Sequence, residues 1–296
     1  MNNEYLFVGE DLKLHTGEEA KERLEGMNDE KFFDGAKGVV CVPKDRWHLA
    51  QSYEKRTWMD ACSHATDDRN EEHAKEFDNF RALFGPSYSR AIELGCGPFT
   101  NLRVIARYVD VGRCVLLDPL IESYKTHRNC AYLHGKVVVA ESRFSQALGK
   151  NKAGRALRRL VRMAHPSCLE EGLVIEKTLP SPIEEMPDCG KFDLVVMINV
   201  IEHCYDIHAI FDKILYLCRA GTRFVFHDRL FRPDEVQQEV KSRFDAGHPL
   251  RVGQNIIREF LEQNFVTLFE HVTDIPDRVG DIDLTEKGIY FIGERV

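Results

Sequence analysis

An apolar run leads into a glycine turn at Arg90-Ala91-Ile92-Glu93-Leu94-Gly95-Cys96-Gly97-Pro98-Phe99-Thr100. The apolar residues predict a buried strand, and glycines, which lack a Cβ, let the backbone turn tightly and approach a ligand. A dinucleotide-binding fingerprint would need a third glycine where this chain has Thr100. No Gly-Lys-Ser/Thr follows, so a P-loop is excluded as well. The turn therefore predicts a ligand that approaches the backbone closely but carries no phosphate chain.

Buried strands and amphipathic helices alternate after this turn. Strand-like runs occur at 114–118, 192–198 and 222–226, and the apolar residues of 207–218 lie on one helical face. This alternation is typical of a doubly wound α/β sheet, in which ligands bind beyond the carboxyl ends of the strands. Asp118 ends the second run, where it can accept hydrogen bonds from a ribose diol.

The first part of the chain predicts a cap on this sheet. Residues 1–70 are polar, glycine-interrupted and then aromatic, so we expect a helical cap over a domain at 71–296 that has no internal linker. The aromatic segment 47–59 is the natural lid over the site. Its Tyr53 and Trp58 are candidates to cover the cofactor or the acceptor, with core packing as the alternative.

An insertion at about 130–172 interrupts the α/β rhythm. Within it, arginines recur at helical spacing, namely Arg155, Arg158, Arg159 and Arg162, opposite an apolar set. The arginine face is either solvated or reads an anionic group of the substrate, such as a phosphate or carboxylate. In the second case Arg158 and Arg159 would bind substrate.

Composition narrows the class of protein. The chain has 296 residues, 43% of them hydrophobic and 30% charged, which is typical of a soluble globular protein. Its formal charge of -8 argues against nucleic acid as a partner. Because we find no run long enough to span a membrane and no secretion signal, we expect a cytoplasmic protein. The nine cysteines form no C-x-x-C pair and are expected to be reduced thiols.

Four motifs in order resemble the class I S-adenosylmethionine (SAM)-dependent methyltransferases. They are E-L-G-C-G at 93–97, L-L-D-P at 116–119, F-D-L-V-V-M-I-N-V-I-E-H-C-Y-D at 192–206 and G-I-Y-F-I-G at 288–293. The resemblance covers about residues 75–296. It implies a Rossmann-like methyltransferase fold with a doubly wound, mostly parallel seven-stranded sheet. It also implies SAM as cofactor and S-adenosylhomocysteine as product.

The resemblance implies a set of cofactor contacts. Glu93 would orient the glycine turn or the ammonium group of SAM, and Asp118 would hold the ribose hydroxyls. The adenine is expected near Ile183, although this chain has Pro182 about where relatives have an Asp. The full set of expected SAM contacts is Glu93, Gly95, Cys96, Gly97, Asp118, Ile183 and Asn199.

The acceptor decides which catalytic groups are needed. An aliphatic hydroxyl must lose a proton as the C–O bond forms, and histidine is suited to receive it near neutral pH. The candidate catalytic residues are His203, His227, Asp228 and His248, each with a structural role as the alternative. Arg251 is a candidate to pair with an acidic substrate. We assign no metal ligands, although a divalent metal held by His203, Asp206, His208, His227 and Asp228 is a less favoured variant.

Together these features predict a cytoplasmic SAM-dependent methyltransferase. Its acceptor would be a small molecule or a glycan, with an anionic group suiting the arginine face, and the methyl group would go to oxygen. The alternatives are an RNA methyltransferase, which the negative charge disfavours, and a non-catalytic SAM-binding protein. The sequence identifies neither the acceptor nor the oligomeric state.

Overall fold

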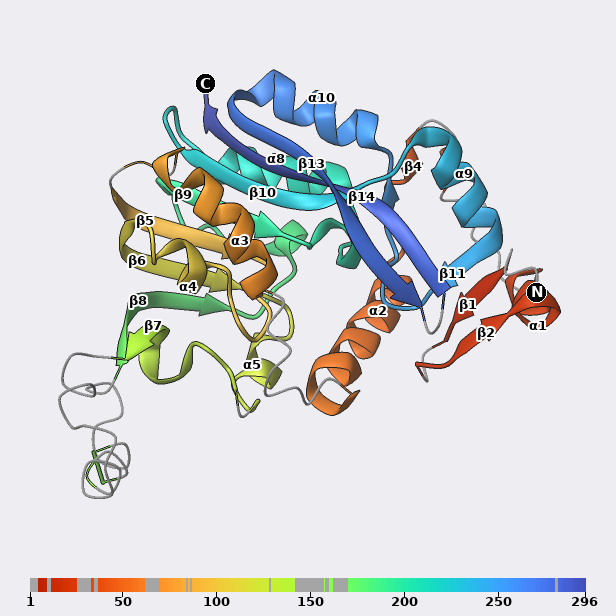
Figure 1. Cartoon of the computed structure of the whole chain (residues 1–296), viewed down its shortest axis with the longest axis horizontal. Coiled ribbons are helices and arrows are strands. Elements are labelled where there is room, and N and C mark those ends of the chain that lie inside the picture. Colours follow the sequence, from red (N-terminus) through yellow and green to blue (C-terminus); the bar gives the residue numbers. More distant parts are fainter. Residues whose placement is uncertain are drawn as a thin grey trace.

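The computed structural model describes residues 5–9, 12–25, 33–34, 37–61, 70–83, 85, 87–127, 129–141, 157, 160–161, 170–279 and 282–296. Eight strands form the central sheet: β5 (Ser87–Leu94), β6 (Asp110–Leu117), β7 (Lys136–Glu141), β8 (Glu170–Leu179), β9 (Leu194–Ile198), β10 (Arg223–Leu230), β13 (Phe265–Val279) and β14 (Ile282–Arg295). Their order across the sheet is β13-β14-β10-β9-β5-β6-β8-β7 (Figure 1).

The sheet is mostly parallel, as expected, but it has eight strands rather than seven. Strands β10, β9, β5, β6 and β8 run parallel, and β14 pairs antiparallel with β10. The additional strand, β7, lies at the start of the expected insertion and pairs antiparallel with β8. Its apolar residues Val137, Val138 and Val139 follow Gly135 and Lys136, and the pairing depends on β8, which local periodicity does not reveal.

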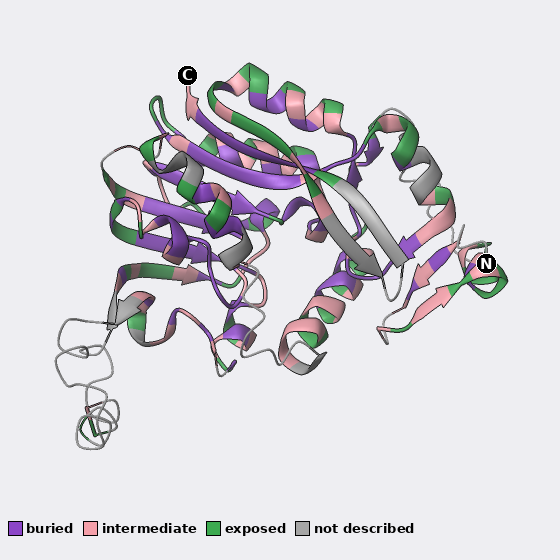
Figure 2. Cartoon of the chain, in the orientation of Figure 1, coloured by how far each residue is buried: buried purple, intermediate pink, exposed green. Residues whose placement is uncertain are grey.

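Helices cover both faces of the sheet (Figure 1). Those flanking it are α3 (Asn70–Phe80), α4 (Leu102–Ile105), α5 (Ile121–Tyr124), α8 (Ile207–Leu217) and α10 (Gln254–Asn264). Residues of β9 alternate between two cores: Val196 packs in the core that contains Phe77 of α3, whereas Val195 packs with Ile210 of α8. Since both faces are covered, β9 is buried throughout and β5 and β6 are buried over their last four residues, which explains the apolar runs at these positions (Figure 2).

Local signals account for the start of α8. The side chain of Asp206 accepts hydrogen bonds from the backbone N–H groups of His208 and Ala209 at 2.9 and 3.2 Å, which is an N-cap. The helix then buries Ile207, Ile210, Ile214 and Leu217 on one face. Asp206 is thus engaged in capping rather than in the metal set that the sequence left as a variant.

The N-terminal region contains more than helices. Besides α1 (Gly17–Glu25), α2 (Lys44–Arg56) and a π-turn at Thr57–Ala61, it supplies β1 (Leu6–Val8), β2 (Leu14–Thr16), β3 (Phe33–Asp34) and β4 (Gly38–Val39). Strand β1 pairs with β11 (Arg243–Asp245), and β4 pairs with β12 (Arg251–Val252). Within the region, β1 also pairs with β2 and β3 with β4. The helical expectation missed these strands because they are only two or three residues long and because β1 and β4 depend on C-terminal partners beside α9 (Pro233–Ser242).

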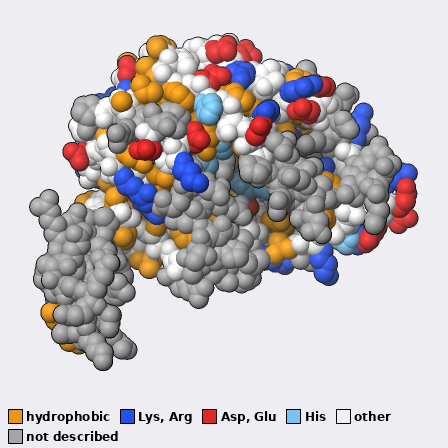
Figure 3. All heavy atoms as spheres, in the orientation of Figure 1, with side chains coloured by type: hydrophobic (Ala, Val, Ile, Leu, Met, Phe, Trp, Pro, Cys, Tyr) orange, Lys and Arg blue, Asp and Glu red, His pale blue; other side chains and the backbone are white. Residues whose placement is uncertain are grey.

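Short 3-10 turns complete the described elements: Arg81–Leu83, Leu133–Gly135, Ile183–Glu185 and Ile201–His203. Among the described residues, no helix has both the length and the apolar character to cross a membrane. On the face drawn in Figure 3, acidic and basic side chains are interspersed rather than gathered into areas of one sign.

Candidate active site

A cavity of about 430 Å³ lies beyond the carboxyl ends of the parallel strands. Its walls come from the glycine turn after β5, the residues after β6 and β9, helix α2, and the connection between β11 and β12. The volume is within the range of small-molecule pockets. This position at the strand ends is where an open α/β sheet binds its ligands.

The turn after β5 is held by backbone geometry. The N–H groups of Gly95 and Cys96 both donate to the carbonyl of Leu117, at 2.8 and 3.1 Å. Gly95 has a φ of 70°, and a Cβ built there would lie 2.5 Å from a methyl group of Val200. Gly97 has a φ of 52°, yet a Cβ there would meet nothing within 4 Å. Gly95 is therefore required by packing, whereas Gly97 leaves open space on the cavity wall for a ligand.

Glu93 holds the segment that follows the turn. Its buried carboxylate accepts hydrogen bonds from the backbone N–H groups of Asn101 and Leu102, at 2.7 and 3.2 Å, and from the hydroxyl of Thr100. Burial raises its pKa to about 7, against these hydrogen bonds, which lower it. Glu93 does not line the cavity, so its position fits orientation of the turn rather than contact with the ammonium group of SAM.

Asp118 links the turn to the end of β6. One carboxylate oxygen accepts the N–H of Gly97 at 3.0 Å and the other accepts the N–H of Leu120 at 2.8 Å. Burial raises the pKa of Asp118 to about 6, although both hydrogen bonds lower it. Asp118 lines the cavity, and each oxygen keeps further acceptor capacity for a hydroxyl donor.

The third part of the cofactor wall is the turn that contains Ile183. Ile183 is buried and lines the cavity next to Glu184. One oxygen of Glu184 accepts the N–H groups of Tyr205 and Asp206, at 2.7 and 3.1 Å. The other is buried and has no hydrogen-bond partner among the described residues. A buried acceptor without a partner is costly, and an adenine amino group would satisfy it. The sequence predicts adenine contact near the segment 181–184, which includes Glu184, but it does not single out this side chain.

A chain of side-chain hydrogen bonds holds Asn199 at the end of β9. Asn199 has a φ of 55° and lines the cavity. Its amide oxygen lies 2.7 Å from Nδ1 of His227, and its amide nitrogen lies 3.3 Å from Nε2 of His73. Nδ1 of His73 is in turn 2.7 Å from the hydroxyl of Tyr290. The side chain of Asn199 is therefore occupied by protein partners, and the residue faces the cavity in a constrained conformation.

Two of the candidate catalytic residues are not brought to the cavity wall. His227 is buried behind Asn199, and burial holds its pKa well below the usual value. Asp228 accepts the N–H groups of Val200 and Ile201, at 3.1 and 2.9 Å, and so holds the turn Ile201–His203. Burial raises its pKa to about 7. Both residues are placed to position neighbours rather than to contact an acceptor.

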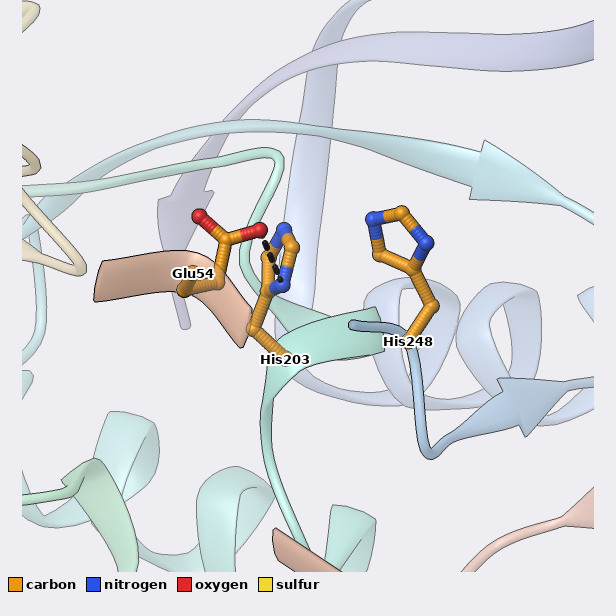
Figure 4. A group of neighbouring side chains, drawn as sticks. All are labelled: Glu54, His203 and His248. Atoms are coloured by element: carbon orange, nitrogen blue, oxygen red, sulfur yellow. Dashed lines mark ion pairs between the residues drawn. The ribbon is translucent and has the colours of Figure 1, made fainter. Parts of the chain in front are cut away.

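The other two candidates lie together on the cavity wall (Figure 4). The imidazole centroids of His203 and His248 are 4.7 Å apart. Nδ1 of His203 is 3.4 Å from a carboxylate oxygen of Glu54 and 3.2 Å from the carbonyl oxygen of Gly247. Helix α2 holds the His203 backbone as well, because the side chains of Trp47 and Gln51 both donate to its carbonyl at 3.1 Å.

Buried charges support His248 from behind. Its Nδ1 is 2.6 Å from a carboxylate oxygen of Asp245, and its Nε2 is 3.6 Å from Glu202. Burial alone would raise the pKa of Glu202, but the charges of Arg229, the two histidines and Arg251 hold it at about 2. Arg251 lies 3.6 Å from Glu202 and does not line the cavity. The structure therefore places Arg251 in a buried ion pair, not against an acceptor.

The remaining candidates for substrate binding fall into two groups. Tyr53 and Trp58 line the cavity, and Trp58 packs edge-on against Phe99 with ring centroids 5.8 Å apart. Arg158 and Arg159 lie outside the described residues. Of the apolar set opposite them, the described Leu157 and Leu160 are exposed.

The chain has relatives in one sequence family and among solved structures. The sequence model of a family described as "Methyltransferase domain" matches residues 63–271. The N-methyltransferase NodS from Bradyrhizobium japonicum WM9, solved with S-adenosyl-L-homocysteine, is 14% identical with a TM-score of 0.48, covering 83% of this chain and 98% of NodS. A SAM-dependent methyltransferase from Leishmania major is 13% identical with a TM-score of 0.48, covering 99% and 97%.

A third solved structure is 1,6-didemethyltoxoflavin-N1-methyltransferase from Burkholderia thailandensis. It is 12% identical with a TM-score of 0.47, and the match covers 90% of this chain and 98% of that one. No curated protein matches the sequence.

Proposed function

Because the chain belongs to the class I SAM-dependent methyltransferases, we propose that it methylates a hydroxyl group of a small molecule or glycan. SAM, when bound, supplies a methyl group on a sulfonium; the acceptor attacks the methyl carbon in line with the C–S bond, and S-adenosylhomocysteine leaves. The protein's part is to align the acceptor, exclude water and promote loss of the hydroxyl proton. The free thiols among the described residues support a reducing compartment, and we propose the cytoplasm.

The pair of imidazoles on the cavity wall carries the proposal of a hydroxyl acceptor. His203 ends the turn that follows β9, and the ring of His248 lies beside it; both residues line the cavity that the glycine turn also lines. An amine acceptor can react in its unprotonated state and needs no such pair, whereas a hydroxyl must lose its proton. A neutral imidazole within this pair can accept that proton.

The cofactor end of the cavity fits a sulfonium nucleoside. Asp118 would accept hydrogen bonds from the ribose hydroxyls, while its present bonds to Gly97 and Leu120 keep it in place. Gly97 would allow the methionine part to approach the backbone. Glu184 would accept a hydrogen bond from the adenine amino group through its unsatisfied oxygen. Glu93 stays behind the turn and maintains its shape.

The other end of the cavity favours an acceptor of small size that carries negative charge. Arg229 and Arg243 line it together with His203 and His248. Arg229 also lies 3.4 Å from Glu202, and it differs from Arg251 in reaching the cavity wall. Guanidinium groups suit carboxylate or phosphate on the acceptor. We extend this proposal to the arginine face of the insertion, where Arg158 and Arg159 would contact an anionic group of the acceptor outside the cavity.

The experiment is a search for the acceptor with labelled SAM. The purified chain is incubated with fractionated metabolites and cell-envelope glycans of the source organism, and mass spectrometry identifies whatever gains a methyl group. We expect an O-methyl product, and a combined His203→Ala and His248→Ala variant that binds SAM with unchanged affinity but has lost turnover. A methyl group found on nitrogen would refute the hydroxyl assignment. SAM binding without any turnover would indicate a non-catalytic protein.

A further inference from the structure

Three side chains that can bind a metal converge on the cavity wall, and each comes from a different part of the chain (Figure 4). Glu54 belongs to α2 of the cap, and His203 ends the turn Ile201–His203 after β9. His248 lies in the connection between β11 and β12. All three line the cavity, so the group that they form is open to a ligand on one side.

The distances within the group are close to those of a metal site. One oxygen or nitrogen of each residue lies within 4.8 Å of those of the other two. The carboxylate oxygen of Glu54 and Nδ1 of His203 are 3.4 Å apart. A tetrahedral ion with bonds of about 2.0–2.1 Å separates its ligand atoms by about 3.4 Å. A small movement of His248 therefore suffices to complete the set. The ion would replace the contact of 3.2 Å between His203 and the carbonyl of Gly247.

Carboxylates stand behind both imidazoles, as they do around metal-binding histidines. Nδ1 of His248 is 2.6 Å from Asp245, which leaves Nε2 as the nitrogen for an ion. Asp245 is itself held by the backbone N–H of Gly247 at 2.9 Å. On the other side, Nε2 of His203 is 3.9 Å from Glu202. The arrangement orients the two rings without using Glu54, which remains available as a charged ligand.

We propose that Glu54, His203 and His248 form a binding site for one divalent transition-metal ion of the Zn²⁺ class. Two imidazoles and one carboxylate favour such an ion over Mg²⁺ or Ca²⁺, which prefer oxygen ligands. Three protein ligands leave an open coordination position, as in catalytic zinc sites. That position faces the cavity. With the ion bound, the two imidazoles would be its ligands rather than proton acceptors, and the ion would lower the pKa of a bound hydroxyl so that its proton is lost to water.

The inference deepens the proposed function and rests on it for the acceptor, but the binding of the ion can be measured alone. The full chain, freed of metal with a chelator, is titrated with ZnCl₂ by calorimetry and, in parallel, with CoCl₂ by visible absorption. We expect one ion per chain and the d–d bands of tetrahedral Co²⁺. We expect Glu54→Gln, His203→Ala and His248→Ala each to weaken Zn²⁺ binding at least tenfold.

A matched control separates this site from binding elsewhere on the chain. His48 is exposed on the same helix as Glu54, so His48→Ala should bind Zn²⁺ like the wild-type chain. SAM affinity of every variant is measured to show that the fold persists. Zn²⁺ binding that none of the three variants weakens, as expected of surface thiols, would overturn the site, and so would the absence of stoichiometric binding.

The two proposals fail in different ways. If the metal-free chain methylates a hydroxyl at the full rate and binds no ion, the metal site is refuted and the proposed function stands. If one Zn²⁺ binds and the three variants release it, but only nitrogen acceptors are methylated, the metal site stands and the hydroxyl assignment fails.

Discussion

The pH dependence of SAM binding tests the assignment of Asp118 to the ribose. Its carboxyl has a pKa of about 6 in the free protein because burial, and the nearby Glu54, outweigh the hydrogen bonds from Leu120 and Gly97. Hydroxyl donors favour the ionised form, so binding should require it. At pH 5 about one molecule in eleven is ionised, against nearly all at pH 7.5. We therefore expect the Kd of SAM to rise about tenfold between these values, which is about 1.4 kcal/mol.

The effect of pH on the stability of the free protein has the opposite sign to its effect on SAM affinity. Since the folded pKa of Asp118 lies above its unfolded value, this group stabilises the fold at low pH, and that contribution is lost as the pH rises through about 6. The assay is calorimetric titration with SAM and with S-adenosylhomocysteine from pH 5 to 7.5. Asp118→Asn should bind both weakly and without pH dependence. A wild-type Kd that is constant over this range would refute the reasoning, and pH dependence that persists in Asp118→Asn would point to Glu93 instead.

Three further changes separate the roles of other residues. Gly95→Ala should lower the free energy of unfolding by about 2–4 kcal/mol in urea titrations, because the new methyl group clashes with Val200 and the backbone has a positive φ. Gly97→Ala should lower it by only about 1–2 kcal/mol, because only the positive φ is unfavourable there. Equal losses in the two variants would contradict the packing argument. Arg251→Ala should cost about 1–3 kcal/mol, because Glu202 loses one buried partner but keeps Arg229 at 3.4 Å. A stable variant with a raised acceptor KM would instead restore Arg251 as a substrate ligand. Arg158→Ala combined with Arg159→Ala should raise the acceptor KM and leave SAM affinity unchanged. If the double variant has the wild-type KM, the insertion does not bind the acceptor.

The position of the candidate cofactor residues in the fold was predictable because it depends on local geometry. Gly95 and Gly97 follow a short apolar run, and Asp118 ends the next one, so strand period and turn chemistry place all three at one sheet edge. The structure adds the contact that joins them, since the Asp118 carboxylate accepts a hydrogen bond from the Gly97 N–H. The parallel core of the sheet followed from the same alternation of strands and helices.

The sequence alone could not distinguish which of the candidate histidines face the cavity. His203, His227 and His248 all follow strands or lie near their ends, and periodicity treats them alike. In the structure His227 is held behind Asn199, whereas His203 and His248 face the cavity. Which way a histidine points at the end of a strand depends on the neighbouring strand and on the residues packed against it, and these are tertiary contacts.

Short-range patterns in the chain determine the α/β sheet, the glycine turn and the carboxylate of Asp118, because each depends on residues close together in sequence. Tertiary folding alone brings Glu54 of the cap to His203, and Glu202 to His248 and Arg251. Strand β1 likewise pairs with β11 only in the folded chain. These contacts join segments that share no hydrophobic period and no sequence motif. The contacts between charged side chains form because a buried charge needs a partner, wherever in the chain that partner lies.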